Sequence, residues 1–407
     1  MQKKKSLILL TNNYPSDYGD TSFIKTEVAI LSQLYSSVYI FRFAKNDNFM
    51  DIPMPKNVVL FELGLNGKAH ILIKGIFNST SLIKTFQLLR QEYQLLTKLA
   101  HLKNLIFATL CGRYFSSKIN NLTKKSDQSY DLYAFWGIGS GYSIPWVHHD
   151  LLRKTWIRLH GGDLYIDRQQ GYIPYRKAIF SAVDVIVPIS KQGENYLSTT
   201  YAAYNIQTKL FTNYLGSVDY GIPTLPIKTD AAFVIVSCSS VIKLKRVGLI
   251  FQSIYLASQS SQIIWHHFGD GSDMPVLRSL VQNTPVSINL QIFFHGQVSH
   301  GKVLEFYQEN HVDLFINLSE TEGIPVSIME AISFNIPTLA TNVGGVGEII
   351  NQDFGTGLLI PLNSSAEYIC NRILLLQTLT NLYPRDYWSR HFNKIINMNK
   401  LVTYLNI

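Results

Sequence analysis

Short apolar runs alternate with longer, helix-like segments along the chain of 407 residues. Many of these runs are apolar at every position rather than at every second one, as expected of parallel strands that are covered on both faces of a sheet. Strands and helices that alternate in this way build doubly wound α/β domains. The predicted strands span residues 6–11, 37–43, 57–63, 131–137, 155–160, 183–190, 233–238, 263–269, 291–296, 313–319, 337–341 and 357–362.

The length of the chain predicts two domains, because a single hydrophobic core rarely serves more than about 250–300 residues. Residues 217–232 contain two prolines and no hydrophobic periodicity, which is typical of a connection between domains. We therefore expect one doubly wound domain at residues 1–216 and a second at residues 217–385, with a cleft between them. Residues 386–407 are expected to form a helix that returns to the first domain.

The cysteines and the start of the chain bear on its compartment. Cys111, Cys238 and Cys370 are odd in number, far apart and outside any CxxC pattern, which favours reduced thiols in a cytoplasmic protein. The lysines at the start precede an apolar run of only "LILL", which predicts a strand rather than a signal peptide. No stretch approaches the roughly 18 apolar residues that would cross a bilayer. The expected location is therefore cytoplasmic.

Positive charge is concentrated in residues 66–126. This segment carries ten lysines or arginines and one acid, Glu92, so its net charge is +9. The whole chain has a net charge of +8, so the residues outside this segment sum to −1. Large apolar residues such as Leu82, Phe86 and Tyr93 recur there at helical spacing. One interpretation is a basic amphipathic surface that binds an anionic membrane peripherally, on the inner face of the cytoplasmic membrane. The other is an ordinary core stripe with solvated lysines. Nucleic acid is not an expected partner, since no RNA- or DNA-binding module is visible.

Two glutamates, Glu322 and Glu330, flank a Gly-Ile-Pro bend. Within one helix, residues eight apart would point about 80° from each other and would share a face poorly. Proline is best tolerated at the first helical position, so the helix is expected to begin near Pro325 with Glu322 in the preceding loop. The free N–H groups of the first turn then form an anion site beside two carboxylates. That combination suits a phosphorylated ligand that is rich in hydroxyl groups.

An ordered series of eight motifs resembles a known protein family. The motifs are "YPSDYGDTSFIKTE" at 14–27, "RLHGGDLY" at 158–165, "NYLGSVDYG" at 213–221, "VSCSSVIKLKRV" at 236–247, "FGDGSDMPVLRSL" at 268–280, "FHGQVSHGKVLEFY" at 294–307, "SETEGIPVSIMEAISFNIPTLATNVGGVGEII" at 319–350 and "GTGLLIPL" at 355–362. In this order they resemble the retaining family-4 glycosyltransferases, also described as glycosyl transferases group 1. The resemblance covers roughly 150 residues of the second domain and only scattered loops of the first. It implies the GT-B fold, with two Rossmann-like domains.

The resemblance also implies substrates and site residues. The donor would be a nucleoside diphosphate sugar linked to UDP or GDP, with no separate cofactor, and the acceptor a glycan or a lipid-linked glycan of a surface polysaccharide. The residues with implied catalytic roles are His160, Lys245 and Glu322. The residues with implied donor-binding roles are Gly19, Ser240, Arg246, Val298, Gly323, Ile324, Pro325, Val326 and Glu330.

Each implied role has a chemical basis. Glu330 would accept hydrogen bonds from the two ribose hydroxyls, and Glu322 would hold hydroxyls of the donor sugar. Lys245 would contact the diphosphate as a point charge. Many family members have an arginine five positions before that lysine, whereas this chain has Ser240, so either Arg246 compensates or the serine marks a subgroup. The alternative for each of these residues is an ordinary place on a helix or loop surface.

The histidines of the chain allow more than one interpretation. His160 would face the reacting sugar, because Gly161 and Gly162 let the backbone approach a ligand closely. The alternative is a histidine satisfied at a strand end. The histidine pairs at 148–149 and 266–267 lack a third ligand at a recognisable offset, and the chain contains no Asp-x-Asp motif. We therefore expect no metal at the site.

The predicted reaction keeps the configuration at C1. The only carboxylates at hand are assigned to binding, so we favour attack on the same face, with a departing phosphate oxygen taking the proton of the acceptor. The alternatives are a glycoside hydrolase that uses Glu322 and Glu330 as acid and base, a nucleotide-sugar epimerase, and a non-catalytic nucleotide-sugar-binding protein.

Overall fold

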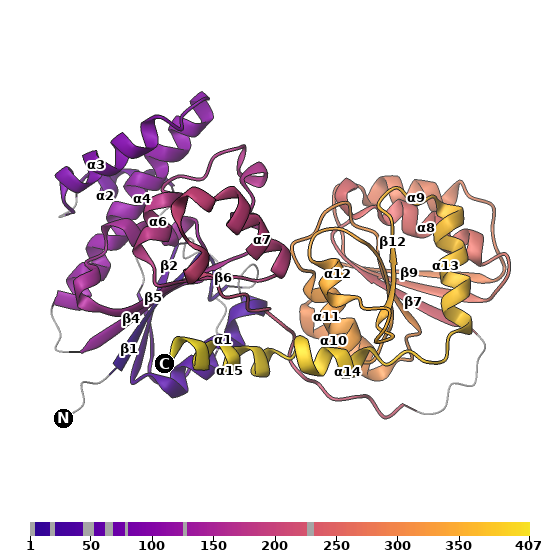
Figure 1. Ribbon diagram of the computed structural model, residues 1–407. Coiled ribbons are helices and arrows are strands. Elements are labelled where there is room, and N and C mark those ends of the chain that lie inside the picture. The colour runs from indigo at the N-terminus through magenta and orange to yellow at the C-terminus, as the bar shows by residue number, and fades with distance from the viewer. Residues whose placement is uncertain are drawn as a thin grey trace. The chain divides into compact units, whose positions relative to one another are not determined.

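The computed structural model describes residues 5–16, 21–43, 53–61, 68–77, 80–124, 128–225 and 232–407 (Figure 1). The chain divides into two compact units, one formed by Met1–Asn213 with Val402–Ile407 and the other by Tyr214–Leu401. The division after Asn213 falls three residues before the boundary predicted from the sequence. Of the segment 386–407, only the last six residues belong to the first unit, and the segment contains two helices rather than one.

The first unit contains a parallel sheet of six strands in the order β3-β2-β1-β4-β5-β6. The strands are β1 (Lys5–Thr11), β2 (Ser37–Arg42), β3 (Val58–Phe61), β4 (Ser129–Ala134), β5 (Leu152–Leu159) and β6 (Val185–Pro188). The α-helices are α1 (Thr21–Leu34), α2 (Lys68–Ile76), α3 (Leu82–Tyr93), α4 (Leu99–Lys124), α5 (Gly161–Leu164), α6 (Arg176–Ala182) and α7 (Lys191–Thr200). Residues 7–10 of β1 are all fully buried, which explains why this strand is apolar at successive positions.

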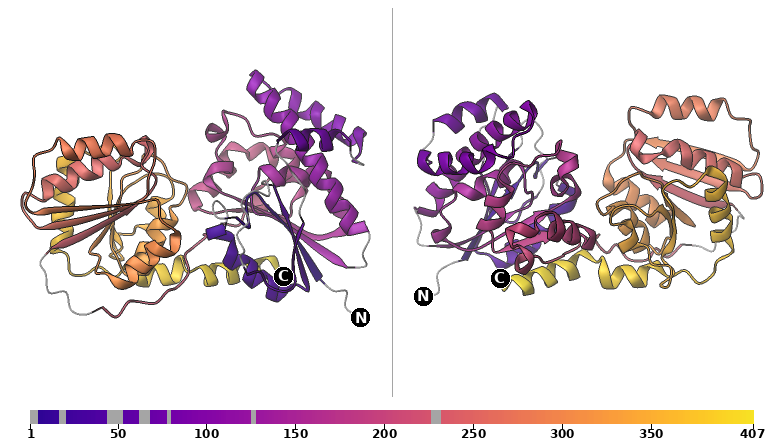
Figure 2. Two further views of the ribbon diagram at one scale, coloured as in Figure 1. Left: turned by 180° about the vertical axis from the view of Figure 1, so that it is seen from behind. Right: turned by 45° about the horizontal axis from the view of Figure 1, so that its top comes forward.

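The second unit contains another parallel sheet of six strands, in the order β12-β11-β10-β7-β8-β9, with helices on both of its faces (Figure 2). The strands are β7 (Phe233–Cys238), β8 (Ile263–Phe268), β9 (Leu290–Gly296), β10 (Leu314–Asn317), β11 (Thr338–Thr341) and β12 (Gly357–Ile360). The helices are α8 (Val247–Ala257), α9 (Met274–Gln282), α10 (His300–Glu309), α11 (Val326–Ser333), α12 (Val346–Ile349), α13 (Ala366–Thr378) and α14 (Pro384–His391), followed by α15 (Lys394–Leu405), whose residues from Val402 on belong to the first unit. All twelve strands of the described residues overlap the predicted runs, so the prediction of doubly wound α/β architecture is confirmed.

The strand order of the second sheet decides which loops become neighbours. The chain runs from β7 through β8 to the edge strand β9, and then returns to place β10 on the other side of β7. Ligands of doubly wound sheets bind where the strand order reverses in this way, outside the carboxyl ends of the strands. The loops that follow β7 and β10 meet there, and the amide of Glu320 donates to the carbonyl of Leu244 at 2.8 Å.

Candidate functional site

The segment between β10 and α11 carries the two glutamates in the predicted arrangement. Pro325 has extended backbone angles and immediately precedes the helix, which begins at Val326, one residue later than expected from proline at the first helical position. Glu322 lies in the loop, whereas Glu330 lies inside the helix and is only 9% exposed. Among the described residues, no side chain caps the start of α11, so the first N–H groups of the helix have no side-chain acceptor.

Lys245 and Glu322 form an ion pair at the switch point. The Nζ atom of Lys245 lies 2.6 Å from Oε1 of Glu322, and both side chains are mostly buried, at 25% and 12% exposed. The side-chain amide of Asn317 also lies 3.4 Å from Oε1 of Glu322. Lys245 ends a short 3₁₀ helix, Lys243–Lys245, that follows β7. The sequence predicted that Lys245 contacts the diphosphate and that Glu322 binds the donor sugar. The structure adds that these two side chains contact each other.

Glu330 has a partner that the sequence did not reveal. The Nε2 atom of His300, the first residue of α10, lies 2.6 Å from Oε1 of Glu330. This hydrogen bond raises the pKa of His300 above its ordinary value, against the opposing effects of burial and of nearby Lys394. A histidine in the first turn of a helix was the available signal, because the helix dipole disfavours a cation there. A partner elsewhere in the fold was needed to explain it.

Arg246 is held by two hydrogen bonds within the fold, while its Nη2 is buried without a hydrogen-bond partner among the described residues. Its Nε donates to the carbonyl of Leu318 at 2.5 Å and its Nη1 donates to the carbonyl of Leu362 at 2.7 Å. The residue itself has a left-handed backbone, with φ of 48°, at the start of α8. This arrangement favours a structural role that ties α8 to the loops after β10 and β12. Ser240, the other residue in question, is exposed.

Two glycines hold the backbone around Glu322 in place. Gly344 has φ of +55°, and a Cβ atom added there would lie 2.0 Å from the carbonyl oxygen of Glu322. The amide of Gly345 donates to the carbonyl of Gly323 at 2.7 Å. A larger side chain at Gly344 would therefore displace the Glu322 backbone. Gly323 and Val326 are partly exposed, whereas Ile324 and Pro325 are buried.

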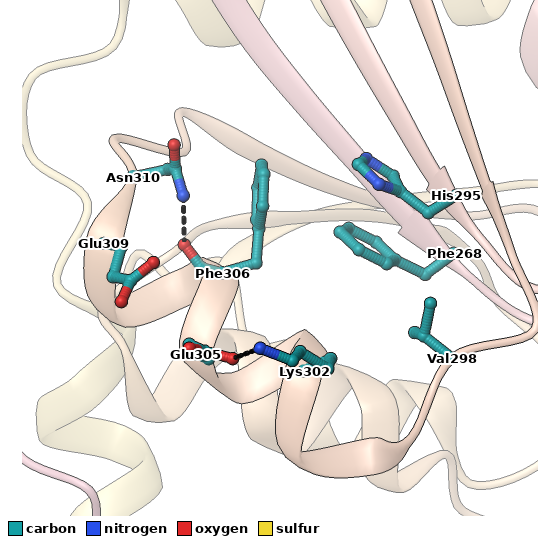
Figure 3. Close-up of a pocket in the computed structure, with 8 residues that line it drawn as sticks. All are labelled: Phe268, His295, Val298, Lys302, Glu305, Phe306, Glu309 and Asn310. Atoms are coloured by element: carbon teal, nitrogen blue, oxygen red, sulfur yellow. Dashed lines mark hydrogen bonds and ion pairs between the residues drawn. The ribbon is translucent and has the colours of Figure 1, made fainter.

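Val298 lines a hollow of about 270 Å³ between the ends of β8 and β9 and one side of α10 (Figure 3). The rings of Phe268 and His295 are stacked there, with centroids 4.1 Å apart and planes 5° apart. Lys302 and Glu305 form an ion pair of 2.5 Å on the helical side. The hollow thus offers flat aromatic surfaces and polar groups beside Val298.

His160 follows β5 in the first unit and is buried, with 5% of its surface exposed. Its ring packs against Phe135 and Trp136, with centroids 4.7 and 4.1 Å away. Burial and the charge of Arg158 lower the pKa of His160 well below its ordinary value, so the imidazole is neutral. None of the described residues provides a hydrogen-bond partner for either ring nitrogen. The backbone of His160 is fixed instead, because its amide donates to Oδ1 of Asp163 at 2.6 Å.

The described residues bear on three further expectations, which concern Gly19, a metal site and membrane-spanning helices. Gly19, in the first-strand loop, lies outside them. Within them, no three histidine, cysteine, aspartate or glutamate side chains group as metal ligands, and the metal-independence of the site stays a prediction. In the same residues, no helix has the length and apolar character needed to cross a membrane.

Comparison with known proteins identifies the second unit. Residues 227–385 match the family model of glycosyl transferases group 1. This region is a group 1 glycosyltransferase domain. The UDP-N-acetylglucosamine–peptide N-acetylglucosaminyltransferase GtfA subunit of Streptococcus pneumoniae is 22% identical over 50% of this chain and 38% of its own length. The O-antigen biosynthesis glycosyltransferase WbnH of Escherichia coli is 43% identical over 15% of this chain and 17% of its own length. The chain therefore spans well under two thirds of these relatives.

The solved structures extend the likeness to the fold of the whole chain. HepE from Anabaena, crystallised with UDP, superimposes with a TM-score of 0.63 at 12% sequence identity, covering 99% of both chains. With two parallel sheets of six strands and this likeness over both units, the glycosyltransferase domain is part of a GT-B fold.

Proposed function

We propose that the protein is a retaining glycosyltransferase that moves a sugar from a UDP- or GDP-linked donor to a glycan or lipid-linked acceptor in the synthesis of a cell-surface polysaccharide. The observation that carries this proposal is the Lys245–Glu322 ion pair beside the uncapped start of α11, at the switch point of a group 1 domain. The names of the relatives support it, since one uses UDP-N-acetylglucosamine and another acts in O-antigen biosynthesis.

The donor is assigned by chemistry along this edge of the sheet. A diphosphate suits the free N–H groups of α11 together with the Lys245 ammonium group. Glu330 would bind the ribose hydroxyls, and the hollow beside Val298 has room and flat aromatic walls for a base. In Glu322, Oε1 already accepts from Lys245, which leaves Oε2 for a hydroxyl of the donor sugar.

The reaction breaks the C1–O bond of the donor sugar, and the nucleoside diphosphate leaves. Preorganised donors, namely the helix N–H groups and Lys245, stabilise the charge that develops on the phosphate oxygen without a metal ion. The acceptor attacks on the same face, and the departing phosphate oxygen takes its proton, so the configuration at C1 is retained. The neutral ring of His160, with two unused nitrogens, is suited to hydrogen-bond a hydroxyl of a saccharide substrate.

The acceptor side of the proposal rests on the surface of α2, α3 and α4. Several large apolar side chains stand exposed there, among them Phe77 at 82%, Ile83 at 75% and Phe86 at 72%. The single acid of this segment, Glu92, is buried and accepts a hydrogen bond of 2.6 Å from the hydroxyl of Tyr172. Its exposed charged side chains, among the described residues 68–77 and 80–124, are therefore all cationic. We call the exposed surface of residues 73–77 and 80–106 the basic apolar face, and we propose that it binds anionic lipid.

The structure bears on the two interpretations of the stripe in this segment. Leu88 and Leu105 are part of the core, whereas Leu82, Phe86 and Tyr93 are 72–76% exposed. Apolar patches of this extent on a surface usually mark an interaction site. The apolar exposure combined with basic charge favours a membrane surface near a lipid-linked acceptor over a plain core stripe.

Calorimetric titration with UDP, GDP, UDP-glucose, UDP-N-acetylglucosamine and GDP-mannose tests the donor assignment. We expect one nucleotide series to bind and Glu330→Ala to weaken that binding by tenfold or more, with unchanged circular dichroism. Asp353→Ala serves as the control and should bind normally, because this exposed carboxylate precedes β12, at the edge of the sheet opposite the proposed site. Binding of no nucleotide, together with activity on an aryl glycoside, would overturn the proposal in favour of a hydrolase. Conversion of the donor sugar into another sugar, with no acceptor added, would indicate an epimerase.

A further inference from the structure

His300, the first residue of α10, and Glu330, inside α11, form a hydrogen bond beside the proposed ribose site. The Nε2–Oε1 distance is 2.6 Å, with the His300 side chain 44% exposed and that of Glu330 only 12% exposed. The histidine therefore stands between the carboxylate and solvent. One oxygen of Glu330 is occupied by this contact, and the other is left for a ligand.

The position of His300 is unfavourable unless it has a partner. It is the first residue of α10, where the helix dipole opposes positive charge, and no acidic side chain lies in the first turn of that helix. The groups that act on it come from two other helices: Glu330 of α11 favours the charged imidazole, and Lys394 of α15 opposes it. Glu330 is thus what makes a proton on His300 favourable.

We propose that His300 is a positioning residue for nucleotide binding, which holds Glu330 through Oε1 so that Oε2 meets the ribose hydroxyls and whose proton offsets the carboxylate charge beside the incoming diphosphate. This inference rests on the proposed function, because it assigns Glu330 to the ribose. It adds a consequence that the ribose role alone does not have. Donor binding becomes linked to uptake of a proton on His300.

The direction of the linkage follows from the charges. A bound diphosphate adds negative charge near Glu330, and this favours the protonated form of His300 further. Affinity for the donor is therefore highest when His300 is already protonated and falls as the pH rises through its raised pKa. The other titratable groups around Glu330 are Tyr220, Cys238 and Tyr307, and all three have raised pKa values, with that of Cys238 at about 12. They stay protonated throughout the neutral range.

The test is the affinity for UDP-glucose and GDP-mannose, measured by calorimetry from pH 5.5 to 8.5. Nucleotide sugars are used because their phosphates are esterified and do not titrate in this range, unlike the terminal phosphate of free UDP. The variants are His300→Gln, which keeps a neutral hydrogen-bond donor, and His300→Ala, which removes it. His311→Gln, just beyond the end of α10, is the matched control.

We expect the wild type and His311→Gln to lose affinity several-fold between pH 6 and pH 8. His300→Gln should show a flat profile near the high-pH affinity, and His300→Ala should bind about tenfold more weakly, the factor that one lost charge-assisted hydrogen bond produces. A pH slope that persists in His300→Gln, or full affinity in His300→Ala, overturns the inference while the proposed function stands. If the wild type binds neither UDP-glucose, GDP-mannose nor any other nucleotide, both the proposed function and this inference are refuted.

Discussion

Lys245 and Glu322 form one ion pair, with Nζ and Oε1 separated by 2.6 Å, although the two residues are 77 positions apart in the sequence. If Lys245 stabilises the leaving diphosphate, Lys245→Ala should lower kcat by about 100-fold or more, the range seen when one preorganised donor is removed. Lys243→Ala, an exposed lysine of the same 3₁₀ helix, is the control and should leave kcat within about twofold. Both kcat values are measured by steady-state kinetics with the donor that calorimetry identifies. Equal losses of kcat in the two variants would refute the role of Lys245 in stabilising the leaving diphosphate.

Arg246→Met should affect stability more than binding. The change removes hydrogen bonds to the carbonyls of Leu318 and Leu362, and bonds that involve a charged group contribute about 1.5–3 kcal/mol each. We expect the free energy of unfolding of the second unit to fall by about 2 kcal/mol or more in denaturant titrations. Nucleotide affinity, measured well below the unfolding transition, should change less than about threefold. A large loss of affinity with unchanged stability would instead support the phosphate role considered from the sequence.

His267 should make the second unit less stable in acid. The side chain is fully buried, and burial lowers its pKa to about 4. In the unfolded chain a histidine has a pKa near 6.5. Between about pH 4 and pH 6.5 the unfolded state therefore binds a proton that the folded state does not bind. The stability contribution is present above pH 6.5 and is lost as the pH falls, by about 2 kcal/mol between pH 7 and pH 5. Unfolding of the wild type and of His267→Gln over this range should show a shallower pH dependence in the variant; identical slopes would contradict the assignment.

The basic apolar face should bind vesicles that contain phosphatidylglycerol. Co-sedimentation at low ionic strength should recover the wild type with these vesicles and not with neutral ones, and added salt should weaken the binding. The double variant Ile83→Ser and Phe86→Ser should lose most of it. Val286→Ser with Ile288→Ser is the control, since these side chains of the second unit are 94% and 95% exposed. Absence of wild-type binding at low salt would refute the membrane proposal.

The stereochemistry of the product tests the reaction course separately from the site. Transfer from an α-linked nucleotide sugar should give an α-linked product, because the proposed attack takes place on the face from which the diphosphate departs. NMR of the anomeric proton during the first turnovers distinguishes the two outcomes. An inverted anomer would leave the donor assignment intact and would exclude the same-face mechanism.

Much of the secondary structure could be predicted because its causes are local. A buried parallel strand must be apolar at nearly every position, so β7, with the sequence "FVIVSC" at 233–238, was predicted with its observed bounds. The loop position of Glu322 and the helical position of Glu330 followed from Pro325, which restricts its own backbone. The unit division differed by three residues, because it depends on contacts that no local pattern records.

The sequence by itself determined the α/β architecture, the helix start beside two glutamates and the family resemblance of the second unit, since each depends on neighbours in the chain. The tertiary structure alone decided the partners. Lys245 meets Glu322 because the strand order places β10 beside β7, and His300 meets Glu330 because α10 packs near α11. Charges distant in sequence pair only when a fold brings their elements together, and the spacing of residues along a chain does not contain that information.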